Sequence, residues 1–256
     1  MDAETEALVE RAQNPRLIPG IYNYCNRRCE RCAFTDRCLT YADVRDYERR
    51  HPAADALDPV RDSFRKTWAV IEAWCEREGI DFEKLRAESN SDSARAAERR
   101  ADDEVWGDPL HQLAWSYTSA AFEIVKSLEN AAPFHAWPRR VRDAIDTIGW
   151  SSGMVSAKTH RALHGLRGRE DEPIEWDEIQ NDWNGSAKVA RLVIADTLAA
   201  WEVLLADGGA AADSPLRQIV SLLQRVEAGL AERFPRAMEF VRPGFDEPEI
   251  TSPPSP

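Results

Sequence analysis

The chain has no run of eighteen consecutive apolar residues, so we expect no helix that crosses a membrane. Its first residues, MDAETEALVERAQ, are acidic and typical of a helix. They lack the basic start and the apolar stretch of a signal peptide. We therefore expect a cytoplasmic protein. Thiols stay reduced in that compartment, which makes disulfides the weaker interpretation of its cysteines.

An excess of positive charge is also missing. The 33 Lys and Arg residues face 45 Asp and Glu residues, and the formal net charge is −12 at pH 7. Because the phosphates of nucleic acid and of anionic membranes repel such a chain, we do not expect either as a partner. A protein partner or a small molecule stays open. With 256 residues, the chain is long enough to bury a core without disulfides.

Strand-like alternation of apolar and polar residues is scarce, whereas a period of 3.6 residues dominates. The sequence therefore predicts an all-α protein, a helical bundle of about five long helices. A shorter helix is expected near 41–50. The long helices are predicted at 59–78, 109–130, 137–166, 177–207 and 214–234.

Helix starts are marked by a capping residue followed by proline, at Asp58-Pro59, Asp108-Pro109 and Ser214-Pro215. Thr40 and Asp43 predict a capping box for the short helix. Gly79 suits the end of the first long helix.

Apolar residues at helical spacing predict which faces are buried. On the first long helix this face carries Phe64, Trp68 and Cys75, and Cys75 reads as a small buried hydrophobe. On the second long helix, Trp115 and Phe122 lie opposite the main apolar stripe, which predicts burial on two faces.

Composition divides the chain into three predicted parts. Residues 1–52 hold an N-terminal helix and a cysteine-rich metal-binding segment, residues 53–234 hold the bundle, and residues 235–256 form a disordered, proline-rich tail. The polar stretch 87–104 is predicted to be a solvated helix, a flexible loop or both.

Four of the five cysteines lie in the cysteine-rich segment, Asn23–Cys38, with the sequence NYCNRRCERCAFTDRC. Their spacing, C-x3-C-x2-C-x5-C, is typical of tight turns around one metal centre. The sequence therefore predicts a metal site whose ligands are Cys25, Cys29, Cys32 and Cys38.

An iron–sulfur cluster of the 4Fe-4S type is the first interpretation, because compact cysteine runs more often serve such clusters. Zinc is the alternative, although structural zinc usually takes two cysteine pairs that are well separated. Thiols without a metal are the third. Tyr24 and Phe34 are expected to pack the segment onto the bundle, and its arginines to offset thiolate charge. These arginines are Arg27, Arg28, Arg31 and Arg37.

The first three cysteines resemble the cluster motif of radical S-adenosylmethionine enzymes. The resemblance ends with the spacing, because Arg31 stands where that family has an aromatic residue before the third cysteine. The resemblance would also imply a barrel of alternating strands and helices, which the helical remainder of the chain excludes. The last three cysteines, C-x2-C-x5-C, resemble part of an auxiliary-cluster segment.

Other residues with chemical potential have simpler interpretations. His160 and His164 share a helix face and could bind one metal, but both project away from the predicted core. Glu72 falls within an apolar stripe and would be an acid–base candidate if buried. The basic run Lys158–Arg169 fits a helix C-terminus, where cations offset the helix dipole.

Three functions follow from these patterns. The first is a redox, electron-transfer or redox-sensing protein with an iron–sulfur cluster. The second is a zinc-stapled module that binds another protein. The third is a helical enzyme whose active site lies in the bundle, with the metal segment as support.

Overall fold

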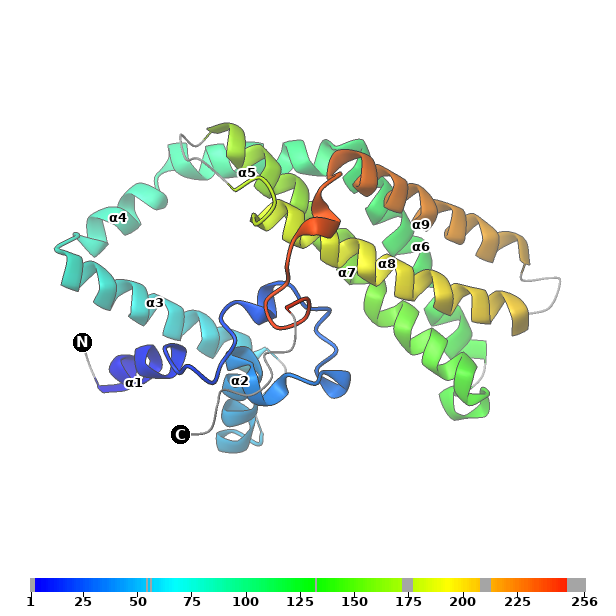
Figure 1. Ribbon diagram of the computed structural model, residues 1–256, viewed down its shortest axis with the longest axis horizontal. Coiled ribbons are helices and arrows are strands. Elements are labelled where there is room, and N and C mark those ends of the chain that lie inside the picture. The colour runs from blue at the N-terminus through cyan, green and yellow to red at the C-terminus, as the bar shows by residue number, and fades with distance from the viewer. Residues whose placement is uncertain are drawn as a thin grey trace. The chain divides into compact units, whose positions relative to one another are not determined.

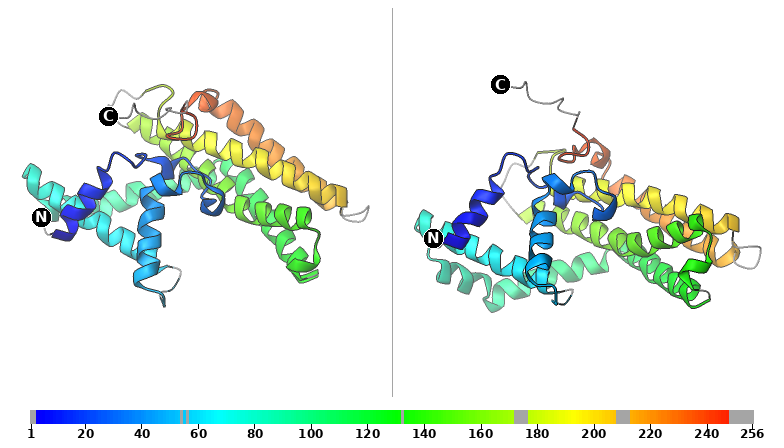
Figure 2. Two further views of the ribbon diagram at one scale, coloured as in Figure 1. Left: turned by 60° about the horizontal axis from the view of Figure 1, so that its bottom comes forward. Right: turned by 90° about the horizontal axis from the view of Figure 1, so that it is seen from below.

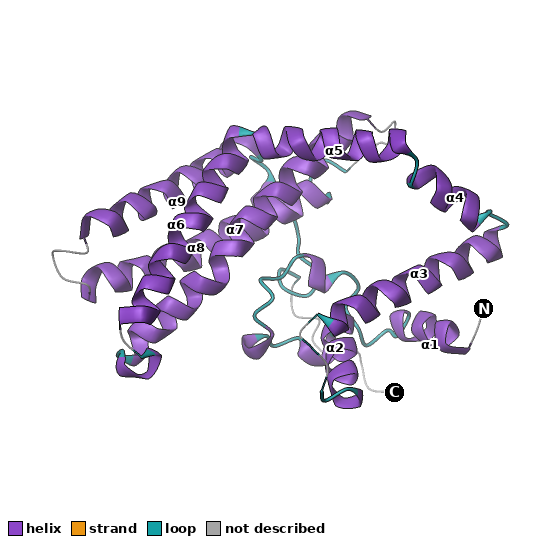
Figure 3. Cartoon of the chain, turned by 180° about the vertical axis from the view of Figure 1, so that it is seen from behind, coloured by secondary structure: helices purple, strands orange, loops and turns teal. Residues whose placement is uncertain are grey.

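The structure of the protein is a computed structural model that describes residues 3–53, 55, 57–131, 133–171, 177–207 and 213–247. Within these ranges every regular element is a helix and none is a strand (Figure 3). The prediction of an all-α protein is therefore confirmed. Of the described helices, none has both the length and the apolar content needed to cross a membrane.

Helices of very different length follow one another along the described chain (Figure 1). They are α1 (Ala3–Ala12), α2 (Leu39–Arg50), α3 (Asp58–Glu78), α4 (Phe82–Ser89), α5 (Asp92–Gly107), α6 (Pro109–Ala131), α7 (Arg139–Asp171), α8 (Asp182–Asp207) and α9 (Asp213–Arg233). The short 3₁₀ helices are η1 (Ile21–Asn23), η2 (Cys29–Arg31), η3 (Thr35–Arg37), η4 (Phe134–Ala136) and η5 (Ala237–Glu239). The five long predicted helices are thus present, and four shorter α-helices accompany them. The polar stretch 87–104 is helical except at the break between α4 and α5.

Contacts between residues divide the chain into two compact units. The first comprises Met1–Arg99 with Arg242–Pro256, and the second comprises Arg100–Val241. This division places α3 with the cysteine-rich segment, whereas the sequence places α3 in the bundle. The predicted ranges 1–52, 53–234 and 235–256 stay a prediction.

In the second unit, α6, α7, α8 and α9 form a four-helix bundle, in which each helix packs against two others (Figure 2). Apolar residues at helical spacing on α7 and α9 are buried, and Ile148 and Leu223 are fully inaccessible. Trp201 of α8 donates its indole N–H to the hydroxyl oxygen of Tyr117 on α6, at 3.1 Å. Burial raises the pKa of Tyr117 to about 12.

The prediction that α6 is buried on two faces is wrong. Trp115 and Phe122 remain 46% and 47% exposed. The buried face of α6 carries Ala114, Tyr117 and Ala121 instead. Since this one face supplies the contacts with α7 and α9, the opposite side is left at the surface.

In the first unit, α3 packs against α1, α2 and α4. Cys75 is fully buried, as predicted, but Phe64 and Trp68 are 64% and 53% exposed. The predicted face is therefore wrong over the first half of α3. Lys66 and Asp62, an ion pair at 2.7 Å, lie on the side toward α1 and α2, so the Phe64–Trp68 side is turned outward.

Two of the predicted helix ends are confirmed. A carboxylate oxygen of Asp108 accepts the amide N–H of Leu110 at 2.8 Å and caps α6. Gly79 ends α3 with a φ of 69°, in the left-handed region that glycine adopts readily. Asp58 lies inside the first turn of α3, and Asp55 accepts its amide N–H instead, at 3.1 Å.

The capping box predicted for the short helix is not formed. The helix α2 begins at Leu39, directly after Cys38, and Cys38 makes no side-chain cap. Asp43 pairs with Arg11 of α1 at 2.7 Å rather than with the helix start. The consequence is that the last cysteine of the segment is held at the N-terminus of α2.

The predicted disordered tail is ordered over its first part. Residues 237–239 form η5, and Phe240 is 4% exposed. The ammonium of Lys188 on α8 donates to the carbonyl of Phe240 at 2.6 Å and holds this segment in the second unit. Residues 248–256 of the predicted tail lie outside the described residues.

Candidate metal centre

The cysteine-rich segment is built from short 3₁₀ helices rather than from long regular elements. Cys29 opens η2, and Cys32 is the residue that ends it. Cys38 ends η3 and precedes α2. Between Cys25 and Cys29, Arg27 has a φ of 58°, a left-handed conformation that is uncommon for a residue other than glycine. Such strained, tight turns allow neighbouring cysteines to face a common centre.

All four predicted ligands line one small cavity of about 30 Å³. The thiols are free of disulfides, and Cys29 is the most exposed of the four. Other residues that line this cavity include Ile21, Tyr22, Thr35, Tyr41 and Phe245. The structure therefore brings the sequence-predicted residues together, at Cys25, Cys29, Cys32 and Cys38.

The neighbouring thiols influence the pKa of Cys29. Burial raises the pKa of Cys29 above its ordinary value, and neighbouring Cys25, Cys38 and Cys32 raise it further. Arg27 acts in the opposite direction and lowers it. A bound cation would favour the thiolate form of Cys29 and so act against this rise in pKa.

Backbone groups of the segment also reach the sulfur atoms. The amide N–H of Phe34 donates to Sγ of Cys32 at 3.4 Å, and the thiol of Cys25 donates to the carbonyl of Tyr22 at 3.6 Å. Hydrogen bonds from backbone amides to sulfur stabilise thiolate ligands and tune the potential of iron–sulfur centres.

A turn from the far end of the chain, residues 242–247, covers the cavity. We call it the C-terminal turn. The ring of Phe245 meets that of Phe34 edge to face, with centroids 5.1 Å apart. Gly244 lies against Ile18 and Ile21, and the guanidinium of Arg242 lies 5.0 Å from the centroid of the Phe245 ring. An ion pair between Arg242 and Asp246 at 2.8 Å holds the turn closed.

Sequence reasoning missed this turn because it falls in the predicted disordered tail. Glycine at 244, between a proline and an aromatic residue, was the one local signal of a defined turn. The predicted docking residue Phe34 does pack, but its partner belongs to the C-terminal turn.

The donor atoms are not yet arranged as in a bound site. Among the described residues, no three His, Cys, Asp or Glu side chains are gathered so that they could hold a metal ion. The cysteines thus share one cavity without the close sulfur geometry of a filled centre. Metal binding would require the four cysteine side chains to rotate about their Cα–Cβ bonds until the sulfur atoms converge on one point.

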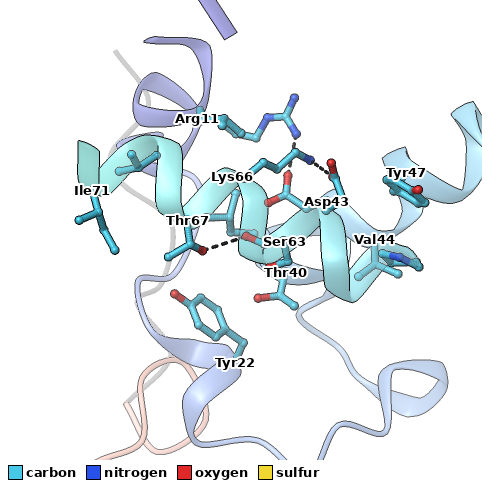
Figure 4. Close-up of a pocket in the computed structure, with 15 residues that line it drawn as sticks. Arg11, Tyr22, Thr40, Asp43, Val44, Tyr47, Ser63, Lys66, Thr67 and Ile71 are labelled. Atoms are coloured by element: carbon cyan, nitrogen blue, oxygen red, sulfur yellow. Dashed lines mark hydrogen bonds and ion pairs between the residues drawn. The ribbon is translucent and has the colours of Figure 1, made fainter. Parts of the chain in front are cut away.

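A larger cavity, of about 420 Å³, lies among α1, α2 and α3 (Figure 4). This volume falls within the range of small-molecule sites, about 300–1,000 Å³. The ion pair between Arg11 and Asp43 lies at its wall, and Lys66 also lines it. Tyr22 lines both this cavity and that of the cysteines, so the two are neighbours.

Comparison of the chain with protein-family models, with curated proteins and with solved structures gives no match. The site must therefore be interpreted from its own residues.

The structure also places Glu72 and the basic run Lys158–Arg169, the other candidates named from the sequence. Glu72 is exposed on α3, so it lacks the burial that an acid–base role would require. In the basic run, Arg161 forms a two-bond ion pair with Asp182, at 2.6 and 2.8 Å, and Arg167 pairs with Glu104. These cations serve contacts within the second unit.

The sequence predicts that His160 and His164 project away from the core. In the structure their rings also have aromatic neighbours. The ring of His160 lies 5.1 Å from that of His111 on α6, and the rings of His160 and His164 are 6.1 Å apart. Sequence reasoning missed His111, which directly follows the buried Leu110 at the start of α6 and carries no spacing signal of its own.

Proposed function

We propose that Cys25, Cys29, Cys32 and Cys38 together hold one metal centre, an iron–sulfur cluster, and that the protein has a redox role as an electron carrier or a redox sensor. The observation that carries the proposal is that all four thiols line a single cavity. The fifth cysteine, Cys75, is buried in α3 and takes no part in that cavity.

The surroundings of the cavity favour a redox centre. Ile21, Phe34 and Phe245 provide apolar cover, which limits the access of water and oxygen to a cluster. The amide that donates to Cys32 would stabilise added negative charge on the sulfur when a cluster is reduced. The exposed edge at Cys29 leaves a short path for an electron to or from a partner protein.

A zinc-stapled interaction module is the second candidate, and the cavity volume favours it. About 30 Å³ is the space of roughly one water molecule, which suits a single ion better than a cubane of eight atoms. Under this candidate the metal fixes the segment at the start of α2, and a protein partner binds the helices. Four thiolates and one zinc ion complete a tetrahedral site with no open position for catalysis.

The enzyme hypothesis is supported least. Its active site is expected in the bundle, where the one hydroxyl described above, that of Tyr117, is buried and hydrogen-bonded to Trp201. The bundle has a cavity of about 330 Å³ lined mainly by apolar residues such as Ile124, Leu128 and Leu204, and the cavity of about 420 Å³ lies beside the cysteines. A reaction at that cavity would depend on the same metal centre, so the metal has to be identified first.

Purification without oxygen distinguishes the first two candidates. The proposal predicts brown protein with broad visible absorbance, together with iron and acid-labile sulfide in equal amounts. A colourless protein with one zinc per chain would show that the metal is structural zinc, and it would exclude the redox role. A protein with neither metal would overturn both candidates.

A further inference from the structure

Two helices of the second unit, α6 and α7, bring three imidazole rings to one place. His111 of α6 lies beside His160 of α7, and His164 follows one helical turn later. Asp102 of α5 reaches the same place, with a carboxylate oxygen 3.9 Å from Nε2 of His164. We call these four residues the histidine cluster. It lies in a different unit from the four cysteines.

The inner end of the histidine cluster has an unsatisfied polar atom. His111 is 1% exposed, and its Nδ1 is buried with no hydrogen-bond partner in the described part of the chain. A buried nitrogen without a partner is unfavourable, so native structures rarely keep one without a reason. Trp106 forms the wall of the site, with its ring centroid 4.5 Å from that of His111.

The pKa values of His111 and His160 bear on whether their rings are neutral. Burial lowers the pKa of His111 and that of His160, and a neighbouring imidazole lowers each further, whereas the backbone of Trp106 raises that of His111 and Asp102 raises that of His160. Neutral imidazole is the form that coordinates a metal. At the outer end, the carboxylate of Asp102 supplies a negative charge.

The ring spacing is close to that of metal-bound histidines. Zn–N bonds of about 2.0–2.1 Å place two rings on one metal with centroids about 5 Å apart at the tetrahedral angle. The His111–His160 separation, 5.1 Å, meets this value. The His160–His164 separation of 6.1 Å is wider, and His164 is exposed enough to turn inward. The i, i+4 spacing of this pair is itself a common metal-binding arrangement.

We propose that the histidine cluster is a second metal site, which binds one divalent ion of borderline softness such as Zn²⁺. Three imidazole nitrogens and one carboxylate oxygen form a donor set that such ions prefer over calcium or magnesium. Since the donor atoms do not converge in the structure, binding requires rotation of the side chains. The bound ion would join α5, α6 and α7 at this end of the second unit.

Cobalt is the probe, because Co²⁺ takes zinc ligand sets and absorbs visible light. The full-length protein, carrying whatever metal its cysteines retain on purification, is titrated with Co²⁺ and followed by absorbance. We expect one further equivalent per chain, with visible ligand-field bands and without the near-ultraviolet band of sulfur bound to cobalt. A sulfur band would report the cysteines and not the histidine cluster.

Three variants locate the ion. His164→Ala removes a half-exposed ligand, and Asp102→Asn removes the charge while keeping the shape. His135→Ala, at an exposed histidine of the same unit, is the matched control. His164→Ala should weaken Co²⁺ binding about 100-fold or more, since even groups that only support ligands are worth about 10–100-fold. The control should bind as the wild type does.

The unfolding midpoint of each variant without metal verifies that it is folded. The proposal is overturned if the wild type takes up no cobalt beyond a sulfur-bound equivalent. It is equally overturned if His164→Ala, folded like the wild type, binds Co²⁺ with the affinity of the His135→Ala control. Neither outcome tests the cysteine site, because cobalt bound by cysteine is recognised separately by its sulfur-to-cobalt absorption band.

Discussion

Phe34, inside the cysteine-rich segment, meets Phe245 near the end of the chain edge to face, with ring centroids 5.1 Å apart. Phe245 also lines the cavity of the four cysteines. The C-terminal turn is therefore part of the candidate metal centre. It contributes Phe245 to the lining of the cavity, and its carboxylate at Asp246 is paired with Arg242.

Removing this cover should make the metal easier to extract. Phe245→Ala exposes the cavity to water, and we expect a chelator to remove the metal about tenfold faster while the metal content on purification stays the same. Stopped-flow or manual mixing with a coloured chelator measures the rate. Phe64→Ala is the control, because Phe64 is an exposed aromatic residue of the same unit. Equal rates for the two variants would show that Phe245 does not shield the centre.

The backbone of the C-terminal turn depends on Gly244. A Cβ at this position would lie 2.8 Å from Cδ1 of Ile18 and 3.1 Å from Cδ1 of Ile21, and the φ of 76° is left-handed. Gly244→Ala should therefore lower the free energy of unfolding of the first unit by about 1–3 kcal/mol. The measurement is urea unfolding followed by circular dichroism.

Gly79→Ala separates the two causes of this loss. Gly79 has a similar φ of 69°, but a Cβ there meets nothing within 4 Å. Its substitution should cost only the left-handed strain, about 1 kcal/mol. If Gly79→Ala costs as much as Gly244→Ala, the contact with Ile18 and Ile21 contributes nothing.

The core of the second unit depends on one buried hydrogen bond. Tyr117→Phe removes the oxygen that accepts the indole N–H of Trp201 and leaves this donor unpaired. We expect a loss of about 1–3 kcal/mol in the free energy of unfolding. Tyr47→Phe, at a ring that stacks on His51 in the first unit, should change stability by less than about 0.5 kcal/mol.

The stability of the second unit should depend on pH through its buried histidines. The pKa values of His111 and His160 are below their ordinary value of 6.5, because burial disfavours the charged rings. The unfolded chain then binds protons more readily than the folded one. Stability is complete above pH 6.5 and falls as the pH drops from there toward the folded pKa values. Asp102 and Asp108, which favour the charged rings, limit the fall.

Urea unfolding without added metal, at several pH values from 5 to 8, measures this dependence. His160→Gln removes one of the two titrations and should flatten the curve below pH 6.5, whereas His135→Gln should leave it unchanged. A wild-type curve that rises on acidification would contradict the assignment of neutral, buried rings.

The helices of the bundle could be predicted from sequence because each is encoded locally. The stripe from Val141 to Leu163 on α7 is buried as the period of 3.6 requires. The face of α3 could not be predicted, since the largely buried ion pair of Lys66 and Asp62 takes the inward side while Phe64 and Trp68 stay exposed. Periodicity identifies an apolar face, but it does not state which neighbour will cover it.

The candidate sites show the same limit. The four cysteines could be grouped from their spacing, because they are close in sequence. Phe245 and His111 could not be assigned, since each joins its site through contacts between segments far apart in the chain. Spacing rules describe single turns and helices, and they contain no information on such contacts.

The metal content of two cysteine variants tests the central claim, that four cysteines form one metal site. Cys29→Ser changes a residue of the cavity, and Cys75→Ala changes the buried fifth cysteine of the same unit. Metal per chain, measured by mass spectrometry on folded protein purified without oxygen, should fall to near zero in Cys29→Ser and equal the wild type in Cys75→Ala. Wild-type metal content in Cys29→Ser, or equal losses in the two variants, would contradict the account.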